Sequence, residues 1–250
     1  MPPLAPAQTY FYGYANFATG RNSSALIAAD LNGDGKIDLA VTNFTDNTVS
    51  ILLGKPDGTF ATQVVYPTGN APFALVAADF NGDGKLDLAT VNNPNGAGSV
   101  SVLVGNGDGT FRSHVDYATG NHSTGIVAAD FNRDGKIDLA VANGYSNSVS
   151  ILLGNGDGTF RNQTQVSVGA NPIQIQTADF NGDGKPDLIT LSGCTTCSTI
   201  SPTISVLLGV GDGTFSRKDS PAGNSGSGLA VGDFNGDGKT DVAIAETYAF

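Results

Sequence analysis

A nine-residue segment rich in aspartate occurs five times in this chain. Its pattern is Asp-x-Asn-x-Asp-Gly-Lys-x-Asp, and the copies begin at Asp30, Asp79, Asp130, Asp179 and Asp233. Side-chain oxygens stand at positions 1, 3, 5 and 9 of the segment, and position 7 offers its main-chain carbonyl. Alternating hard oxygen donors, with a glycine that permits a sharp turn, are what Ca²⁺ requires of a protein loop. The segments, called Asp loops below, therefore predict up to five bound Ca²⁺ per chain.

The candidate metal ligands occupy the same five positions in every Asp loop. Each loop has three carboxylates and one amide, and three carboxylates so close together repel one another unless a cation neutralises them. Position 4 is glycine in four loops but Arg133 in the third, where we expect slight strain or a different hydration. Pro186 restricts the backbone before it, at Lys185, in the fourth loop. The candidate ligands are Asp30, Asn32, Asp34, Lys36, Asp38, Asp79, Asn81, Asp83, Lys85, Asp87, Asp130, Asn132, Asp134, Lys136, Asp138, Asp179, Asn181, Asp183, Lys185, Asp187, Asp233, Asn235, Asp237, Lys239 and Asp241.

Two other interpretations of the Asp loops need comparison. An EF-hand requires a bidentate glutamate at position 12 and flanking helices, and no copy has glutamate at that position. Alternatively, Asp, Asn and Gly could simply form tight turns without any metal, as these residues often do. The recurrence of the complete ligand set in five copies favours calcium over a turn alone. The residues at position 12 are Val41, Thr90, Val141, Thr190 and Ile244.

The Asp loops belong to a longer internal repeat. Their starts lie 49, 51, 49 and 54 residues apart. A second segment, Gly-Asp-Gly-Thr-Phe, ends at Phe111, Phe160 and Phe215, and its first, variant copy ends at Phe60. A phosphate-binding loop is excluded for this segment because the lysine of that motif and a following helix are both missing. A hairpin turn with an anchoring phenylalanine is the simpler interpretation.

Each repeat reads as four short strands, designated A to D in chain order. In the third repeat, strand A is expected at 125–129, strand B at 137–141, strand C at 148–153 and strand D from Phe160. Strand A is rich in small residues in every copy, as expected where blades crowd a central axis. Four strands per repeat of about 50 residues, arranged in series, predict an all-β fold, a β-propeller of four-stranded blades.

The sequence contains about five blades' worth of strands, which we take as one domain over residues 1–250. Four blades are complete, and a split or partial fifth has strand D near residues 10–20 and strands A and B at the other end of the chain. Three arrangements remain open: an imperfectly closed five-bladed ring, a piece of a larger propeller, or two chains that complete each other.

The repeats resemble the FG-GAP/VCBS repeats of integrin α-like β-propellers, over roughly residues 9 to 247. The resemblance implies that the Asp loop joins strands A and B and binds calcium. Members of this family are commonly seven-bladed, whereas five Asp loops occur here. Related propellers serve in adhesion, as lectins, and as parts of polysaccharide-degrading enzymes, so the fold alone does not determine the function.

The net charge and the two cysteines limit which binding partners and which cellular compartment we expect for the chain. The 12 Lys and Arg residues face 23 acidic residues, for a net charge of −11, which argues against nucleic acid and anionic membranes. No apolar run approaches 18 residues, so no membrane insertion is expected, and the first six residues lack the features of a signal peptide. Cys194 and Cys197 favour a local disulfide, with free thiols as the alternative. A disulfide and weak calcium sites fit a secreted or cell-surface protein.

The predicted function is a calcium-binding extracellular scaffold that mediates adhesion to a protein or a surface. With two histidines and one glutamate the chain has little acid–base machinery, so we expect no enzymatic activity. A calcium-dependent polysaccharide-degrading domain is the less favoured alternative. We expect a protein or glycan ligand on the face that carries the D–A and B–C loops, and self-association is possible through open blade edges.

A lectin-like propeller is the second functional alternative. It would need aromatic platforms with amide or carboxylate partners in the B–C loops. Two loops have such residues: Phe44 with Asn43 and Asp46, and Tyr145 with Asn143 and Asn147.

Overall fold

The computed structural model describes residues 15–92, 96–193, 202–223 and 226–246. Eighteen strands and no helices are found in these ranges. Four sheets have four antiparallel strands each, paired in chain order, and a fifth sheet has two. This confirms the predicted all-β fold of four complete blades and a partial fifth.

The A strands have seven residues and the B strands six in all five blades, whereas the C and D strands differ in length between blades. The first blade contains β1 (Ser23–Ala29), β2 (Asp38–Asn43), β3 (Thr48–Leu52) and β4 (Val64–Pro67). The second contains β5 (Pro72–Ala78), β6 (Asp87–Asn92), β7 (Ala97–Leu103) and β8 (Val115–Asn121). The third contains β9 (Ser123–Ala129), β10 (Asp138–Asn143), β11 (Ser148–Leu152) and β12 (Thr164–Ser167). The fourth contains β13 (Pro172–Ala178), β14 (Asp187–Ser192), β15 (Thr203–Gly209) and β16 (Phe215–Pro221), and the fifth contains β17 (Gly226–Gly232) and β18 (Asp241–Glu246).

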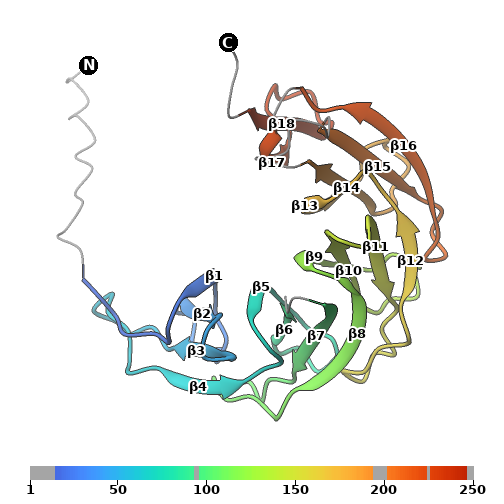
Figure 1. Ribbon diagram of the computed structural model, residues 1–250. Helices are drawn as coiled ribbons and strands as arrows, with labels where there is room; N and C mark the ends of the chain where they lie inside the picture. The colour runs from blue at the N-terminus through green and yellow to red at the C-terminus, as the bar shows by residue number, and fades with distance from the viewer. Residues whose placement is uncertain (1–14, 93–95, 194–201, 224–225, 247–250) are drawn as a thin grey trace, which may run out of the picture.

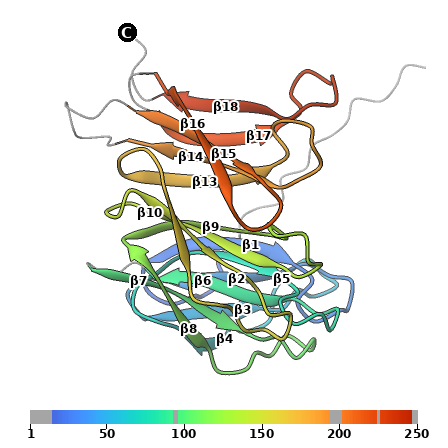
Figure 2. The same ribbon diagram turned by 90° about the vertical axis from the view of Figure 1, so that its right-hand side faces the viewer.

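The blades stand side by side around an arc (Figure 1). The A strands β1, β5, β9, β13 and β17 lie on the inside of the arc, and the D strands β4, β8, β12 and β16 lie on the outside. Neighbouring A strands contact one another, which explains their small residues. The arc is open, with β1 at one end and the β17–β18 sheet at the other. Figure 2 shows the third, fourth and fifth sheets stacked face to face.

Side chains along the central strands point alternately to the two faces of the sheet, which places each hydrophobic core between two blades. In β10, Leu139 and Val141 pack towards the second blade, whereas Ala140 and Ala142 pack towards the fourth. Successive residues of a strand point to opposite faces of the sheet, so a strand covered on both faces is apolar at nearly every position. All six residues of β10 are accordingly buried. The cores are therefore shared between blades.

A side-chain hydrogen bond also joins consecutive A strands. The Ser24 hydroxyl donates to the carbonyl of Pro72 at 2.8 Å, and the Thr124 hydroxyl donates to the carbonyl of Pro172 at the same distance. In both pairs the acceptor is the first residue of the next blade's A strand. This carbonyl is thus satisfied by the preceding blade.

The outer strand differs from the sequence-based expectation. In the third blade, strand D begins at Thr164 and not at Phe160, and Phe160 forms an isolated bridge with Gly154. The bridge continues the hairpin for one pair, with Arg161 N–H donating to the Leu153 carbonyl at 2.8 Å, before the chain departs from the ladder. Residues 15–18 are likewise not in a strand, although Phe17 packs edge-on against Phe60 with centroids 5.1 Å apart. The rest of the expected N-terminal strand lies outside the described residues.

A buried polar chain crosses each of the first three blades near the B–C loop. In the third blade, the Asn143 amide donates to Ser150 Oγ at 2.8 Å and to Ser148 Oγ at 3.2 Å. Ser150 Oγ in turn contacts Gln163 and accepts from the N–H of Gly120 at 3.1 Å. Asn143 and Ser150 are fully buried, so these bonds replace water for the Ser150 hydroxyl and for the amide nitrogen of Asn143.

Replacing Ser150 with alanine should lower the free energy of unfolding by about 1–3 kcal/mol, because it leaves buried donors of Asn143 and Gly120 without an acceptor. Chemical denaturation measures the change. Ser167→Ala, an exposed serine on β12 of the same blade, should change stability by less than about 0.5 kcal/mol. Equal effects of the two substitutions would contradict a role for the buried chain.

Candidate metal centre

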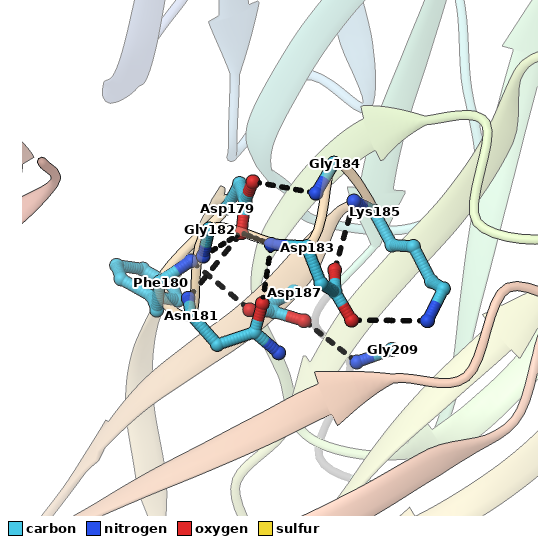
Figure 3. Close-up of polar contacts among 9 residues, drawn as sticks. All are labelled: Asp179, Phe180, Asn181, Gly182, Asp183, Gly184, Lys185, Asp187 and Gly209. Atoms are coloured by element: carbon cyan, nitrogen blue, oxygen red, sulfur yellow. Dashed lines mark hydrogen bonds and ion pairs between the residues drawn. The ribbon is translucent and has the colours of Figure 1, made fainter.

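All five Asp loops connect an A strand to a B strand, as the sequence resemblance implied. In the fourth blade, β13 ends at Ala178, the loop begins at Asp179, and β14 begins with Asp187 at position 9. Glycines at positions 4 and 6 have positive φ, for example 76° at both Gly182 and Gly184. The two left-handed residues turn the chain back so that the side chains of positions 1, 3, 5 and 9 lie around the same turn (Figure 3).

The carboxylate at position 1 accepts hydrogen bonds from the loop's own backbone. Asp179 Oδ1 accepts from the N–H of Gly182 at 2.7 Å and of Asp183 at 3.2 Å, and Oδ2 accepts from Gly184 at 2.8 Å. Hydrogen bonds from backbone N–H groups, that of Gly184 first, lower the pKa of Asp179. The Asn181 side-chain oxygen accepts from the same Asp183 N–H at 2.8 Å. Positions 1 and 3 therefore hold the turn in shape as charged and neutral acceptors.

The carboxylate at position 5 pairs with the lysine two residues later. Asp183 Oδ1 accepts from the N–H of Lys185 at 3.0 Å, and Oδ2 lies 3.0 Å from Lys185 Nζ. The side-chain bond to Lys185 is the main cause of the lowered pKa of Asp183. In the first loop the Asp34–Lys36 pair has the same arrangement at 2.9 Å. An ammonium group thus partly neutralises the carboxylates of these two loops.

The carboxylate at position 9 is buried and ties three chain segments together. Asp187 Oδ2 accepts from the N–H of Phe180, and Oδ1 accepts from the N–H of Gly209 at the end of strand C, at 3.0 and 2.7 Å. Asp38, Asp87 and Asp138 make the same pair of bonds, and all four carboxylates belong to residues with 0% exposure. Burial raises the pKa of Asp87 and Asp187, and it raises that of Asp138 to about 6.

The third and fifth loops depart from the common arrangement. In the third, Arg133 adopts a φ of 60°, a left-handed conformation in which the other loops have glycine. The expected difference at this position is thus a backbone one, because a Cβ at positive φ is unfavourable. In the fifth, Asp241 at position 9 is only partly buried and accepts from the N–H of Phe234 at 3.1 Å. In the fourth loop, where Pro186 restricts the backbone before it, Asp187 keeps both of its bonds.

The side chains of each loop surround one turn but are not gathered on a common point. Within the described ranges, no three or more Asp, Glu, His or Cys side chains lie close enough together to hold a metal ion as they stand. The reason is visible in the fourth loop (Figure 3). Asp179 is directed at backbone N–H groups, Asp183 at Lys185, and Asp187 at Phe180 and Gly209.

A contact between blades, which the sequence analysis missed, covers two of the Asp loops. The N–H of Gly158, in the C–D turn of the third blade, donates to the carbonyl of Phe80, position 2 of the second loop, at 3.1 Å. Gly213 and Phe131 repeat this bond one blade further on, at 3.2 Å. A Cβ at Gly158 would lie 2.9 Å from Val104 Cγ2 and 3.6 Å from the Cβ of Asn81, a candidate ligand. The second glycine of Gly-Asp-Gly-Thr-Phe recurs in every copy, but it recurs also at Gly58, where nothing lies within 4 Å of a Cβ, so the glycine alone does not identify the contact.

The opposite face of the arc carries the D–A and B–C loops, as predicted. The N–H of Phe44 donates to the carbonyl of Asn22 at 3.0 Å, and the N–H of Gly144 donates to that of His122 at 2.7 Å, which joins the two kinds of loop. Tyr145 is 63% exposed and stacks on His122, with ring centroids 4.1 Å apart. Burial lowers the pKa of His122, which favours its neutral form.

The two expected aromatic platforms on this face are not equivalent. Phe44 is half-buried and stands where the third blade has Gly144, whereas Tyr145 is exposed. The amides proposed to accompany them, Asn43 and Asn143, are fully buried within the blades.

The carboxylate proposed for the first platform is also engaged within the chain. Asp46 is bound to Arg21 through both the main-chain N–H and the guanidinium Nε, at 2.7 and 2.6 Å. Tyr145 is therefore the aromatic residue of the two that is available to a ligand.

The chain matches one known family of repeats. The FG-GAP-like repeat matches the chain four times, over residues 30–90, 89–141, 130–190 and 196–244. The chain belongs to the FG-GAP-like repeat family. The Asp loops and their connection of strands A and B thus follow the pattern of the family repeat.

Solved structures with this arrangement of blades share little sequence with the chain. The biofilm matrix protein Bap1 of V. cholerae is 22% identical, with a TM-score of 0.54 over 83% of this chain and 30% of that one. A putative 6-phosphogluconolactonase of Bacteroides uniformis is 15% identical, with a TM-score of 0.57 over 82% of this chain and 59% of that one. A Lactobacillus plantarum protein is 15% identical, with a TM-score of 0.60 over 92% and 66%. At these identities the likeness concerns the fold alone.

Three further observations concern related proteins, membrane-spanning helices and the two cysteines. No curated protein matches the sequence. Within the part of the chain that the structure describes, no helix is long and apolar enough to cross a membrane. Cys194 and Cys197, for which a disulfide was expected, lie outside the described residues.

The inter-blade contact predicts unequal effects of two matched glycine substitutions. Gly58 and Gly158 occupy the same place in C–D turns, with φ of 78° and 83°, so alanine at either costs roughly 1–2 kcal/mol of backbone strain. A Cβ at Gly58 meets no atom within 4 Å, whereas one at Gly158 collides with Val104. Gly158→Ala should therefore lower the melting temperature distinctly more than Gly58→Ala. Equal decreases in melting temperature would show that the contact of this turn with the preceding blade does not affect stability.

The buried carboxylates predict an unusual pH dependence in the absence of divalent cations. A carboxylate whose pKa is raised in the folded state binds a proton more readily when folded, so stability rises as pH falls from 7 through 6. Asp138→Asn removes this titration from one site, although its amide can accept only one of the two N–H groups. With chelator present, the difference in unfolding free energy between wild type and Asp138→Asn should grow from pH 7 to pH 5. His122, whose pKa is lowered, makes the same opposite contribution in both proteins, so it cancels in the difference. A difference in unfolding free energy that stays constant from pH 7 to pH 5 would contradict the raised pKa of Asp138.

Proposed function

We propose that this protein is a calcium-stabilised extracellular scaffold, in which the Asp loops bind Ca²⁺ and the face with the D–A and B–C loops binds a protein or a surface. The observation that carries the proposal is the fivefold recurrence of a loop with three carboxylates and one amide in a chain of the FG-GAP-like repeat family. A repeated structural turn requires no such concentration of negative charge.

The donor set of the loops suits a hard divalent cation. In each loop the oxygens of positions 1, 3, 5 and 9 lie around one turn, and each carboxylate oxygen has lone pairs beyond those used for backbone N–H groups. In the first loop the ion would be held by the side chains of Asp30, Asn32, Asp34 and Asp38 and by the carbonyl of Lys36. A bound calcium would supply the charge that offsets three neighbouring carboxylates. Up to five ions would neutralise most of the net charge of −11.

Binding requires the lysine at position 7 to leave the carboxylate at position 5. Lys36 and Lys185 are the cations that pair with this carboxylate in the first and fourth loops, and their side chains are 34% and 28% exposed. A partly exposed ion pair contributes little stability, so its exchange for a divalent ion is inexpensive. The carbonyl of the same lysine then remains as the position 7 donor.

The compartment is part of the proposal. Calcium sites of extracellular modules have dissociation constants of about 10⁻⁴–10⁻³ M and are filled only where calcium is abundant. In the first four loops here the aspartate of position 5 is exposed, that of position 1 is half-buried, and that of position 9 alone is fully buried. Weak sites of this kind favour a secreted or cell-surface protein, for which filled loops would be part of the stable fold.

The ligand face is the one that carries the D–A and B–C loops. The opposite face is taken up by the Asp loops and the C–D turns, which are alike in sequence from repeat to repeat, and at two blade boundaries the turn donates a hydrogen bond to the preceding Asp loop. The B–C loops differ between blades, and binding residues are concentrated on variable loops that a rigid scaffold positions. We therefore place a protein or surface ligand there. The proposal assigns no catalytic role to any residue.

A glycan ligand is the second candidate, and one observation favours it. The stacked pair of His122 and Tyr145 forms a flat aromatic surface on the ligand face, with Tyr145 63% exposed. Aromatic faces of this kind pack against apolar faces of sugar rings. A glycan array with wild type and Tyr145→Ala separates the two candidates: binding lost only in the variant supports a lectin, and no glycan binding supports a protein ligand.

Removal of calcium should destabilise the protein. A site filled at one hundred times its dissociation constant adds about 2.7 kcal/mol to stability, so chelation should lower the melting temperature by several degrees. Native mass spectrometry should detect up to five bound Ca²⁺. A melting curve unchanged by chelator, together with a calcium-free mass, would refute the proposal.

Two aspartates of the third blade provide a matched test of the ligand assignment. Asp134 is position 5 of the Asp loop, whereas Asp157 caps the C–D turn by accepting from Thr159 N–H at 3.0 Å. Asp134→Asn should remove one bound Ca²⁺ and reduce the calcium-dependent rise in melting temperature. Asp157→Asn should lower the melting temperature equally with and without calcium. The reverse pattern would show that the ligands are assigned to the wrong segment.

A further inference from the structure

The dipeptide Asn-Gly occurs in three structural settings in this chain. Asparagine followed by glycine deamidates readily, because glycine has no Cβ to keep its main-chain nitrogen away from the asparagine side chain. Four copies occupy positions 3 and 4 of the Asp loops, two lie in C–D turns, and one ends β10. In that order the asparagines are Asn32, Asn81, Asn181 and Asn235, then Asn106 and Asn155, then Asn143. Asn95, which also precedes a glycine, lies outside the described residues.

The reaction makes specific demands on the glycine N–H. Its nitrogen loses the proton to solvent and attacks the asparagine Cγ. A bond from this nitrogen to Cγ forms, the bond from Cγ to Nδ2 breaks, and Nδ2 takes a proton from solvent and leaves as ammonia. Water then opens the succinimide ring at either carbonyl, which gives aspartate or isoaspartate. The steps before ring closure are anionic, so a free N–H and a nearby positive charge favour them.

The Asp loops and β10 engage the groups that would react. In all four Asp loops concerned, the glycine N–H donates to the carboxylate at position 1 at 2.7–2.8 Å. The asparagine side-chain oxygen accepts from the position 5 N–H at 2.8–3.0 Å. Loss of a proton from an N–H that faces a carboxylate brings two negative charges together. Asn143 is fully buried, and the N–H of Gly144 donates to the carbonyl of His122 at 2.7 Å.

The C–D turns leave the same groups available. Asn106 and Asn155 are exposed, so water reaches both. Within the described ranges, no group accepts a hydrogen bond from the N–H of Gly107 or Gly156. Each asparagine side chain is held by one surface hydrogen bond, from Nδ2 to the hydroxyl of the threonine four residues later, at 2.8 Å in the second blade and 2.9 Å in the third. The glycine nitrogen can therefore be deprotonated without loss of a structural bond.

A lysine side chain lies against each of these two glycines. A Cβ built on Gly107 would lie 2.6 Å from Lys85 Cδ, and one built on Gly156 would lie 3.0 Å from Lys136 Cδ. Each lysine is position 7 of the Asp loop in the same blade. Its ammonium group supplies a positive charge near the nitrogen that must become anionic.

The aspartate of each turn is a negative charge whose effect is partly offset. In the second blade, hydrogen bonds from Thr110 are the main cause of the lowered pKa of Asp108, and the charge of Lys85 adds to it. The third blade has the same arrangement around Asp157. The charge of the aspartate is thus taken up by neighbours within the turn, whereas the Asp loops bring three carboxylates to one place.

We propose that Asn106 and Asn155 are sites of spontaneous deamidation to aspartate and isoaspartate, and that the Asp loops protect their own asparagines from it. The lysine against each turn accelerates the reaction there. The first and fourth C–D turns have Lys55-Pro56 and Val210-Gly211 in the place of Asn-Gly, so they lack the reacting amide. The modification is therefore confined to the turns of the second and third blades.

Isoaspartate at residue 155 would reach the neighbouring blade. It adds one atom to the main chain of a hairpin that the N–H of Asn155 closes on the carbonyl of Thr159 at 2.9 Å. The same turn donates from the N–H of Gly158 to the carbonyl of Phe80 at 3.1 Å. Modification here should weaken the contact between the second and third blades.

The test is to map deamidation site by site in the folded and the unfolded chain. The whole protein is kept for days in mildly alkaline buffer with chelator, and peptides are analysed by mass spectrometry for conversion of the amide to the acid. In the folded chain, Asn106 and Asn155 should react at least about tenfold faster than the four Asp-loop asparagines, since those must first break a hydrogen bond to a charged group. In guanidinium chloride all should react at similar rates. Equal rates in the folded chain, or an undiminished difference in denaturant, would overturn the proposal.

Two lysine substitutions act as controls for each other. Lys85→Gln should slow deamidation of Asn106 by about two- to fivefold, as expected for loss of one partly exposed charge, and should leave Asn155 unchanged. Lys136→Gln should do the reverse. Each variant keeps its main-chain carbonyl, and an unchanged melting curve shows that it is folded. A change of equal size at both sites, or none at either, would overturn the role assigned to the lysines.

Discussion

The buried carboxylate at position 9 is the constraint on which each blade depends. In four blades it accepts two backbone hydrogen bonds, one from position 2 of the Asp loop and one from a glycine that ends strand C or follows it by two residues. A buried charge is expensive, and it is tolerated here because backbone dipoles surround it. The start of strand B, the Asp loop and the C–D turn are thereby held in one arrangement. In the proposed calcium site the same oxygens would also serve as ligands of the ion.

Packing and loop chemistry are coupled through this arrangement. The N–H of residue 2 is fixed by the position 9 carboxylate, and the side chain of residue 2 fills the boundary with the next blade, as Phe80 and Phe131 do. The carbonyl of the same residue accepts from the C–D turn of that next blade. A change in the Asp loop therefore reaches the core between blades within one residue. The stability of the scaffold and the occupancy of its loops should be closely linked for this reason.

Much of this architecture could be predicted from the sequence because it repeats. Five copies of one pattern gave the all-β class, the four-stranded blade and the A–B position of the loop. The start of strand D was wrong at Phe160, since a single bridge to Gly154 precedes a departure from the ladder that no residue type signals. The burial of Asn43 and Asn143 was also missed, because an asparagine at a strand end reads equally as a ligand or as part of a buried network. Contacts between blades, such as Gly158 with Phe80, depend on a spatial neighbour some 80 residues away and cannot be read from one repeat.

The central claim is that the Asp loops are cation sites and that the lysine at position 7 is a substitute for the ion. Anomalous diffraction from a crystal grown with calcium tests it most directly. We expect a calcium peak in the Asp loops, bonded to the oxygens of positions 1, 3, 5 and 9 and to the position 7 carbonyl, with Lys36 and Lys185 turned away from Asp34 and Asp183. Loops without a peak, in which both lysines remain paired with these aspartates, would contradict the account.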